Sequence, residues 1–141
     1  MKNIKVLMIE DDEDDIVLIK KQLKLSKLFL DLEIVHTAEK GLEYLEKMMR
    51  IDSLKSTPFL ILLDLNLPKM SGLEFLKIIK TDEKMKKIPV IMLTTSDLHN
   101  DIHQAYQYGV NSYITKPGDI AQYMRMIELL DGFWFTVVKL P

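Results

Sequence analysis

The sequence predicts an α/β fold, in which one open sheet of five parallel strands carries helices on both faces. Short apolar runs recur along the chain, which is typical of strands buried on both faces. Stretches with helical periodicity separate these runs, and strands that alternate with helices build parallel sheets through right-handed crossovers. The run Phe59–Leu63 stops at a lone carboxylate, Asp64. In such a sheet, functional groups lie at the carboxyl ends of the strands.

Composition indicates one ordinary globular domain. The chain has 141 residues, a formal net charge of -2, 48% hydrophobic residues and no cysteine, which excludes disulfides and thiol chemistry. Its first apolar run is too short for a signal peptide or a membrane span, so we expect a cytoplasmic protein without a membrane partner. The mild acidity argues against direct contact with nucleic acid.

The chain begins with a predicted strand, Val6–Ile9, which six acidic residues follow, Glu10–Asp15. Such a run is most often the solvated start of a helix, where negative charge meets the positive end of the helix dipole. That interpretation suits Glu13–Asp15, but Glu10 and Asp11 directly follow a buried strand. The apolar stripe of the first helix then consists of Ile16, Ile19 and Leu23.

A second strand is predicted at Leu32–His36, where Thr37 can cap a helix from Ala38 to about Arg50. A polar loop leads to the third strand, which is the run that ends at Asp64. Pro68 and Gly72 then force a turn, and a helix follows with an apolar stripe that ends near Thr81.

The carboxyl-terminal half predicts two more strands. Val90–Leu93 is apolar and ends in Thr94-Thr95-Ser96, and a helix follows from about Asp97 to Tyr108, where Gly109 ends it. Asn111–Thr115 is more polar, as an edge strand should be, and Lys116-Pro117 follows it. The last helix extends to about Leu130.

Side by side, the strand ends form one group of polar residues. A strand order of 2-1-3-4-5 puts the topological switch point between the first and third strands. Those two strands end in Glu10-Asp11 and in Asp64, while the fourth and fifth end in Thr94 and Lys116. We therefore expect all five side chains to meet in one crevice.

This group of residues predicts a phosphoryl acceptor site. Clustered carboxylates repel one another unless a cation intervenes, and an all-oxygen set without His or Cys favours Mg²⁺ over zinc or copper. A carboxylate such as Asp64 can attack a phosphoryl group to give an aspartyl phosphate. Mg²⁺ and the Lys116 ammonium would neutralise the oxygens of the transferred group, and the Thr94 hydroxyl could bond one of them.

Residues 1–131 closely resemble the receiver domain of two-component response regulators, and the site residues named above belong to the motifs that carry this resemblance. Four segments carry the resemblance: Ile9-Glu10-Asp11, Leu63–Pro68 with Gly72, Pro89–Thr94 and Tyr113–Pro117. It implies a flavodoxin-like fold, in which Asp64 is phosphorylated by a histidine kinase. Thr95 and Gly118 depart from the family pattern, which usually has a very small residue and an aromatic residue at these places.

The resemblance also implies roles for the other residues. Mg²⁺ would be held by Asp11, Asp64 and the backbone carbonyl of Asn66, with Glu10 bonding mainly through water. Lys116 would act at the catalytic site and precede a cis bond to Pro117, because proline lowers the cost of that isomer. Thr94 and Tyr113 would form the switch pair. The partner surface would comprise the last helix, the fifth strand and the helix from about Asp97.

The chain end resembles the stand-alone regulators that partner bacterial phytochromes. We expect residues 132–141 to be an aromatic extension, Phe133-Trp134-Phe135 onward, with no output domain. These aromatic residues either cover the core beneath the last helix or form a homodimer contact, and neither alternative is favoured.

Two other function classes stay open beside the phosphoacceptor. An Asp-nucleophile phosphohydrolase favours a second Asp two residues after the nucleophile, where this chain has Asn66, which cannot transfer a proton. A pseudo-receiver that binds partners without phosphorylation is the third class. Every acceptor residue is present, so only Thr95 keeps this class open.

Overall fold

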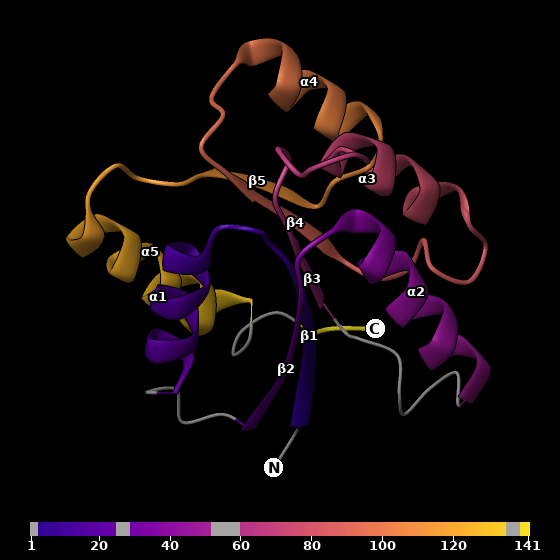
Figure 1. The fold of residues 1–141 in the computed structure, drawn as a ribbon, viewed down its shortest axis with the longest axis horizontal. Coiled ribbons are helices and arrows are strands. Elements are labelled where there is room, and N and C mark those ends of the chain that lie inside the picture. Colours follow the sequence, from indigo (N-terminus) through magenta and orange to yellow (C-terminus); the bar gives the residue numbers. More distant parts are fainter. Residues whose placement is uncertain (1–2, 25–28, 52–59, 135–138) are drawn as a thin grey trace.

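The computed structural model describes residues 3–24, 29–51, 60–134 and 139–141. Within them, five strands alternate with five helices (Figure 1). In chain order the elements are β1 (Asn3–Ile9), α1 (Glu13–Leu23), β2 (Phe29–Val35), α2 (Ala38–Ile51), β3 (Leu60–Leu63), α3 (Gly72–Thr81), β4 (Val90–Thr94), α4 (His99–Gln107), β5 (Ser112–Thr115) and α5 (Ile120–Phe133).

The strands form one sheet in the order β2-β1-β3-β4-β5, and every pair is parallel. This confirms the predicted fold class and strand order. The register aligns Ile9 of β1 with Leu63 of β3, and Thr94 of β4 with Thr115 of β5. The carboxyl ends of these strands therefore lie along one edge of the sheet.

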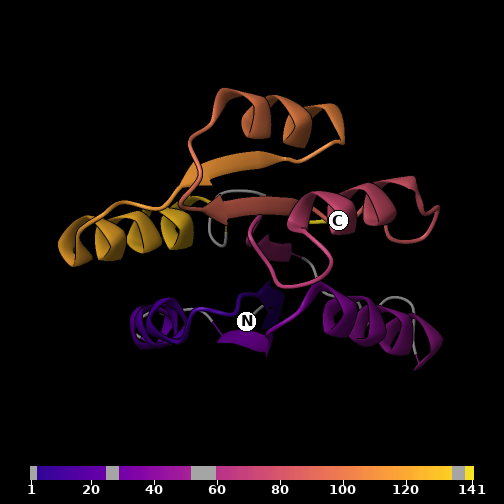
Figure 2. The ribbon, with the colours of Figure 1, turned by 45° about the horizontal axis from the view of Figure 1, so that its top comes forward.

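Two apolar clusters hold the layers together. On one face, Leu45 of α2, Phe75 of α3 and Ala105 of α4 pack against alternate residues of the central strands. On the other face, Ile16 and Ile19 of α1 pack with Tyr123 and Ile127 of α5. Figure 2 shows α1 and α5 together on their side of the sheet. β3 and β4 are buried along their whole length, which explains their uninterrupted apolar sequences.

Side-chain caps explain where several helices begin. The Asp12 carboxylate accepts hydrogen bonds from the backbone N–H groups of Asp14 and Asp15 at the start of α1. Thr37 accepts one from the N–H of Lys40 at the start of α2, as predicted. Gly109 has a φ of 98° and follows the end of α4, which confirms its predicted role as the helix stop.

A few predicted boundaries were wrong by two or three residues. β2 begins at Phe29 rather than Leu32, because pairing with β1 extends the strand through Asp31, where the apolar pattern breaks. α4 begins at His99 rather than Asp97, since Leu98 occupies the N-cap position without a side-chain cap. α5 extends beyond Leu130 to Phe133. The predicted start of the third strand, Phe59, and Phe135 lie outside the described residues.

Gly72 closes the loop that follows β3. Its backbone N–H donates to the carbonyl of Leu65 at 2.8 Å. A Cβ atom at this position would lie 2.2 Å from the backbone oxygen of Asp64 and 2.7 Å from Cα of Leu65. Only glycine fits this close approach of two backbone segments.

We predict that Gly72→Ala destabilises the fold by about 3 kcal/mol, because the methyl group must displace the backbone next to Asp64. The matched control is Gly132→Ala in α5, where a Cβ meets no atom within 4 Å. That variant should keep its stability or gain up to about 1 kcal/mol from helix propensity. Urea unfolding of both variants measures the difference, and equal stabilities would contradict the steric explanation.

Candidate functional site

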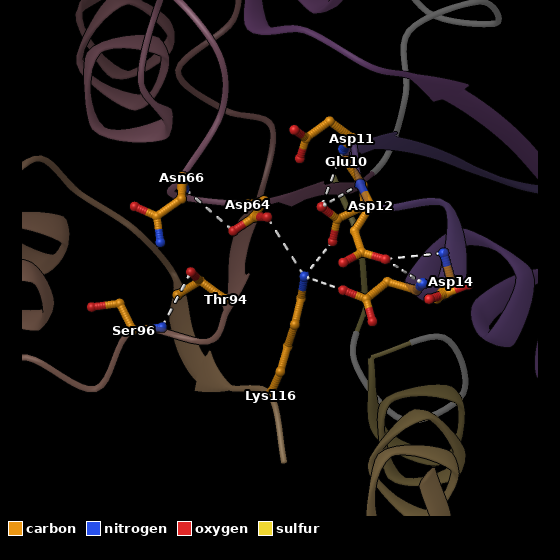
Figure 3. Close-up of polar contacts among 10 residues, drawn as sticks. Glu10, Asp11, Asp12, Asp14, Asp64, Asn66, Thr94, Ser96 and Lys116 are labelled. Carbon is orange, nitrogen blue, oxygen red and sulfur yellow. Dashed lines mark hydrogen bonds and ion pairs between the residues drawn. The ribbon is translucent and has the colours of Figure 1, made fainter. Parts of the chain in front are cut away.

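The predicted site residues meet at the carboxyl edge of the sheet (Figure 3). Glu10 and Asp64 follow the paired ends of β1 and β3, and the N–H of Asp64 donates to the carbonyl of Ile9 at 3.1 Å. Thr94 ends β4, and its carbonyl accepts from the N–H of Lys116 at 2.7 Å. The crevice predicted from the strand order is therefore present.

Lys116 lies at the centre of this group. Its side chain is only 3% exposed, and its ammonium contacts three carboxylates. It donates a hydrogen bond to Glu10, and its Nζ lies 2.7 Å from Oδ2 of Asp15 and 3.5 Å from Oδ2 of Asp64. One buried cation thus joins the ends of β1 and β3 to the first turn of α1.

Asp64 is held from two sides. The residue is 8% exposed, one carboxylate oxygen faces Lys116, and the other accepts from the backbone N–H of Asn66 at 3.3 Å. These contacts hold its carboxylate at the crevice. The Asn66 side chain is exposed. Coordination of a metal by the Asn66 backbone carbonyl stays a prediction.

Glu10, Asp11 and Asp64 form a candidate cation site. Each offers a carboxylate oxygen, and these oxygens all lie within 4.8 Å of one another. Glu10 and Asp64 are buried, whereas Asp11 is exposed. The second oxygen of Glu10 accepts from the N–H of Asp11 at 3.1 Å, so the loop after β1 fixes its orientation. Three converging carboxylates suit a hard divalent cation that keeps part of its water shell.

Burial and hydrogen bonds between the side chains shift the pKa values of Glu10 and Lys116. Burial, and then the neighbouring Asp64 carboxyl, raise the pKa of Glu10 to about 8, although Lys116 acts in the opposite direction. Burial alone would lower the pKa of Lys116, but hydrogen bonds to Asp15 and Glu10 raise it above its ordinary value. Lys116 therefore stays positively charged over the ordinary pH range. The acidic side chains around it outnumber this one positive charge, which favours the binding of a second cation.

Thr94 and Tyr113 both bond the backbone of Ser96. The Thr94 hydroxyl is fully buried and accepts from the N–H of Ser96 at 3.4 Å. The Tyr113 hydroxyl donates to the carbonyl of Ser96 at 2.8 Å. A movement of the Thr94 hydroxyl toward Asp64 would therefore disturb the loop that the Tyr113 ring holds.

Sequence reasoning missed Asp15, which it assigned to the solvated helix start. The side chain of Asp15 is 18% exposed and pairs with Lys116. Asp15 precedes Ile19 by four residues, so helical periodicity places it on the buried stripe of α1, a signal that could have indicated an inward carboxylate. The predicted cis bond before Pro117 was wrong, because this bond is trans, the isomer that X–Pro bonds favour.

Comparisons with known proteins identify the chain's relatives. The family described as "Response regulator receiver domain" matches residues 6–128. The chain is 35% identical to response regulator Rcp1 of Synechocystis sp. over 136 residues, covering 96% of this chain and 92% of Rcp1. It is 37% identical to chemotaxis protein CheY1 of Helicobacter pylori over 114 residues, covering 81% and 86% of the two chains.

Solved structures agree with these relatives. The Mn²⁺-bound form of Rcp1 superposes with a TM-score of 0.89 at 35% identity, and the match covers 97% of this chain and 98% of that one. The phosphorylated cyanobacterial phytochrome response regulator RcpA gives a TM-score of 0.91 at 36% identity, with 99% of each chain covered.

In the described part of this chain, no helix has the length and apolar character that a membrane crossing requires.

We predict that Mg²⁺ binds more tightly as the pH rises toward about 8, because the Glu10 proton must leave before the carboxylate can serve the cation. Well below that pH, affinity should rise about tenfold per pH unit. Calorimetric titrations at several pH values measure this dependence. Glu10→Gln has no proton to release and should flatten it, so an unchanged slope in that variant would contradict the assignment.

Proposed function

Because the chain belongs to the response regulator receiver family, we propose that Asp64 accepts a phosphoryl group from the phosphohistidine of a histidine kinase. The chain is a receiver-domain response regulator of two-component signalling. One observation carries the assignment to Asp64. Asp64 is a buried carboxylate with a fixed cation beside one oxygen, a backbone N–H on the other, and two further carboxylates within the reach of a metal ion. Glu10 makes comparable contacts, but burial raises its pKa to about 8, so Glu10 keeps a proton near neutral pH and Asp64 is the carboxylate that can attack.

The transfer follows from the arrangement of these groups. An Asp64 oxygen attacks the phosphorus, the phosphorus–nitrogen bond to the donor histidine breaks, and its electron pair returns to the imidazole. The transferred group carries charge on three oxygens. Lys116 lies within reach of one of them, and the Thr94 hydroxyl can donate to another. No general base is needed, because Asp64 attacks as a carboxylate.

A bound cation completes this charge balance. Receiver domains bind a divalent metal through an acidic cluster, and the relative Rcp1 is known in an Mn²⁺-bound form. We propose that Mg²⁺ is the ion here, held by Asp11, Asp64 and the Asn66 carbonyl, with Glu10 contributing mainly through water. Mg²⁺ would neutralise phosphoryl oxygens during the transfer. The carboxylate surplus around Lys116 supports this choice.

The protein would act as a switch rather than as a turnover enzyme. Its chemistry would be limited to its own phosphorylation and slow loss of the phosphoryl group. Asn66, two residues after Asp64, offers no acidic proton, which argues against rapid hydrolysis of external phosphate esters. The donor kinase would be of phytochrome type, by analogy with the relative RcpA, a phytochrome response regulator.

The switch would act through the face formed by α4, β5 and α5. Thr94 and Tyr113 connect the acceptor to this face through Ser96. Exposed apolar residues lie there, including Leu98 before α4 and Leu129 and Phe133 of α5. We propose that residues 1–131 form the receiver and 132–141 an extension. Trp134 and Leu140 pack against the apolar cluster beneath α5, whereas Phe133 is exposed and is the residue of this extension that we propose contributes to homodimers. We propose no contact with nucleic acid. We propose a cytoplasmic location, because the histidine kinase that would donate the phosphoryl group uses ATP, which is in the cytoplasm.

We predict that acetyl phosphate with Mg²⁺ adds one phosphoryl group to the wild-type chain and none to Asp64→Ala, because the acceptor oxygen is lost. Intact-protein mass spectrometry measures the gain. The matched control is Asp97→Ala, an exposed aspartate of the β4–α4 loop, which should be phosphorylated like the wild type. Labelling that survives Asp64→Ala would sink the assignment.

We predict that beryllofluoride with Mg²⁺ increases self-association, because it mimics the phosphoryl group and shifts the α4-β5-α5 face to its active form. Analytical ultracentrifugation with and without beryllofluoride measures the change. Leu129→Glu should abolish it, whereas Val17→Glu, at an equally exposed apolar site on α1, should not. Equal loss in both variants, or no change in the wild type, would argue against this dimer surface.

A further inference from the structure

Lys116 is bound by a carboxylate that the proposed phosphoryl transfer does not use. Its Nζ lies 2.7 Å from Oδ2 of Asp15 but 3.5 Å from Oδ2 of Asp64. Asp15 belongs neither to the cation cluster nor to the acceptor. The ammonium is therefore held on the α1 side of the crevice, away from where a phosphoryl group on Asp64 would stand.

A second unused group lies near Asp15. Tyr123 of α5 is 3% exposed, and its hydroxyl is buried without a hydrogen-bond partner among the described residues. Buried hydroxyl groups are nearly always bonded, so this one requires an explanation. Asp15 and Tyr123 line the same cavity of about 450 Å³, between α1 and the start of α5. Burial, and then the charge of Asp15, raise the pKa of Tyr123, so its hydroxyl keeps its proton.

Phosphorylation would change the balance of contacts between these groups. A phosphoryl group on Asp64 adds negative charge that attracts the Lys116 ammonium. As Lys116 turns toward that group, Asp15 loses its cation while it stays largely buried. A carboxylate in that position needs another donor. Tyr123 lines the same cavity as Asp15, and its buried hydroxyl has no hydrogen-bond partner among the described residues, so it is the candidate donor.

We propose that Asp15 is a positioning residue that holds the Lys116 ammonium while Asp64 is unmodified, and that the Tyr123 hydroxyl bonds Asp15 once Lys116 turns to a phosphoryl group. This inference rests on the proposed function of Asp64. The exchange of partners connects the acceptor to α1 and α5, and this path does not pass through Thr94, Ser96 and Tyr113.

The test is the affinity for beryllofluoride at saturating Mg²⁺, measured by ¹⁹F NMR. Asp15→Asn keeps the shape and an acceptor oxygen but loses the charge that holds Lys116, so binding should tighten about fivefold. Tyr123→Phe loses the new hydrogen bond of the bound state, so binding should weaken about fivefold. Tyr44→Phe on α2 is the matched control and should bind like the wild type.

A double-variant comparison separates the partner exchange from a structural role. In an Asp15→Ala background, Tyr123→Phe should have no further effect on beryllofluoride affinity, because the acceptor is already missing. Weaker binding by Asp15→Asn, or the same effect of Tyr123→Phe in both backgrounds, would overturn the proposal while Asp64 still binds beryllofluoride. If the wild type neither binds beryllofluoride nor accepts phosphate, the proposed function fails, and this inference fails with it.

Discussion

The pairing of one buried lysine with a surplus of carboxylates is the constraint on which the site depends. Lys116 contacts Glu10, Asp15 and Asp64 in a region almost closed to water. A buried charge is tolerated only when it is paired, and one ammonium cannot neutralise both Asp15 and Asp64, even while Glu10, with its pKa raised to about 8, holds a proton. The crevice therefore carries excess negative charge at rest. That excess favours a divalent cation, and the cation in turn permits a phosphoryl group beside it.

The parallel sheet makes this concentration of charge possible. Its register brings the ends of β1, β3, β4 and β5 to one edge, and each loop begins with a polar residue. The apolar clusters on both faces hold the strands in that register. The close approach at Gly72 holds the loop after β3, and the acidic residues of the first loop cap α1 and face the crevice. Fold stability thus offsets the cost of gathering like charges.

Most of this arrangement could be predicted from the sequence, for physical reasons. Apolar runs mark buried strands, and the rule that places sites at a topological switch point located Glu10, Asp64 and Lys116 together. The hydrogen-bond partner of each carboxylate oxygen in the site could not be predicted, because side-chain rotamers depend on tertiary contacts. Asp15 looked like a solvated helix start, yet it faces Lys116. The trans bond before Pro117 also departs from the expectation that the family resemblance supplied.

The central claim is that Asp64 accepts a phosphoryl group because Lys116 and a divalent cation neutralise the negative charge of its oxygens. A crystal structure of the chain with beryllofluoride and Mg²⁺ tests this most directly. We predict beryllium bonded to an Asp64 oxygen, Mg²⁺ held by Asp11, Asp64 and the backbone carbonyl of Asn66, and the Lys116 ammonium bonded to a fluorine. Beryllofluoride on another carboxylate, or Lys116 without any contact to the bound group, would contradict the account.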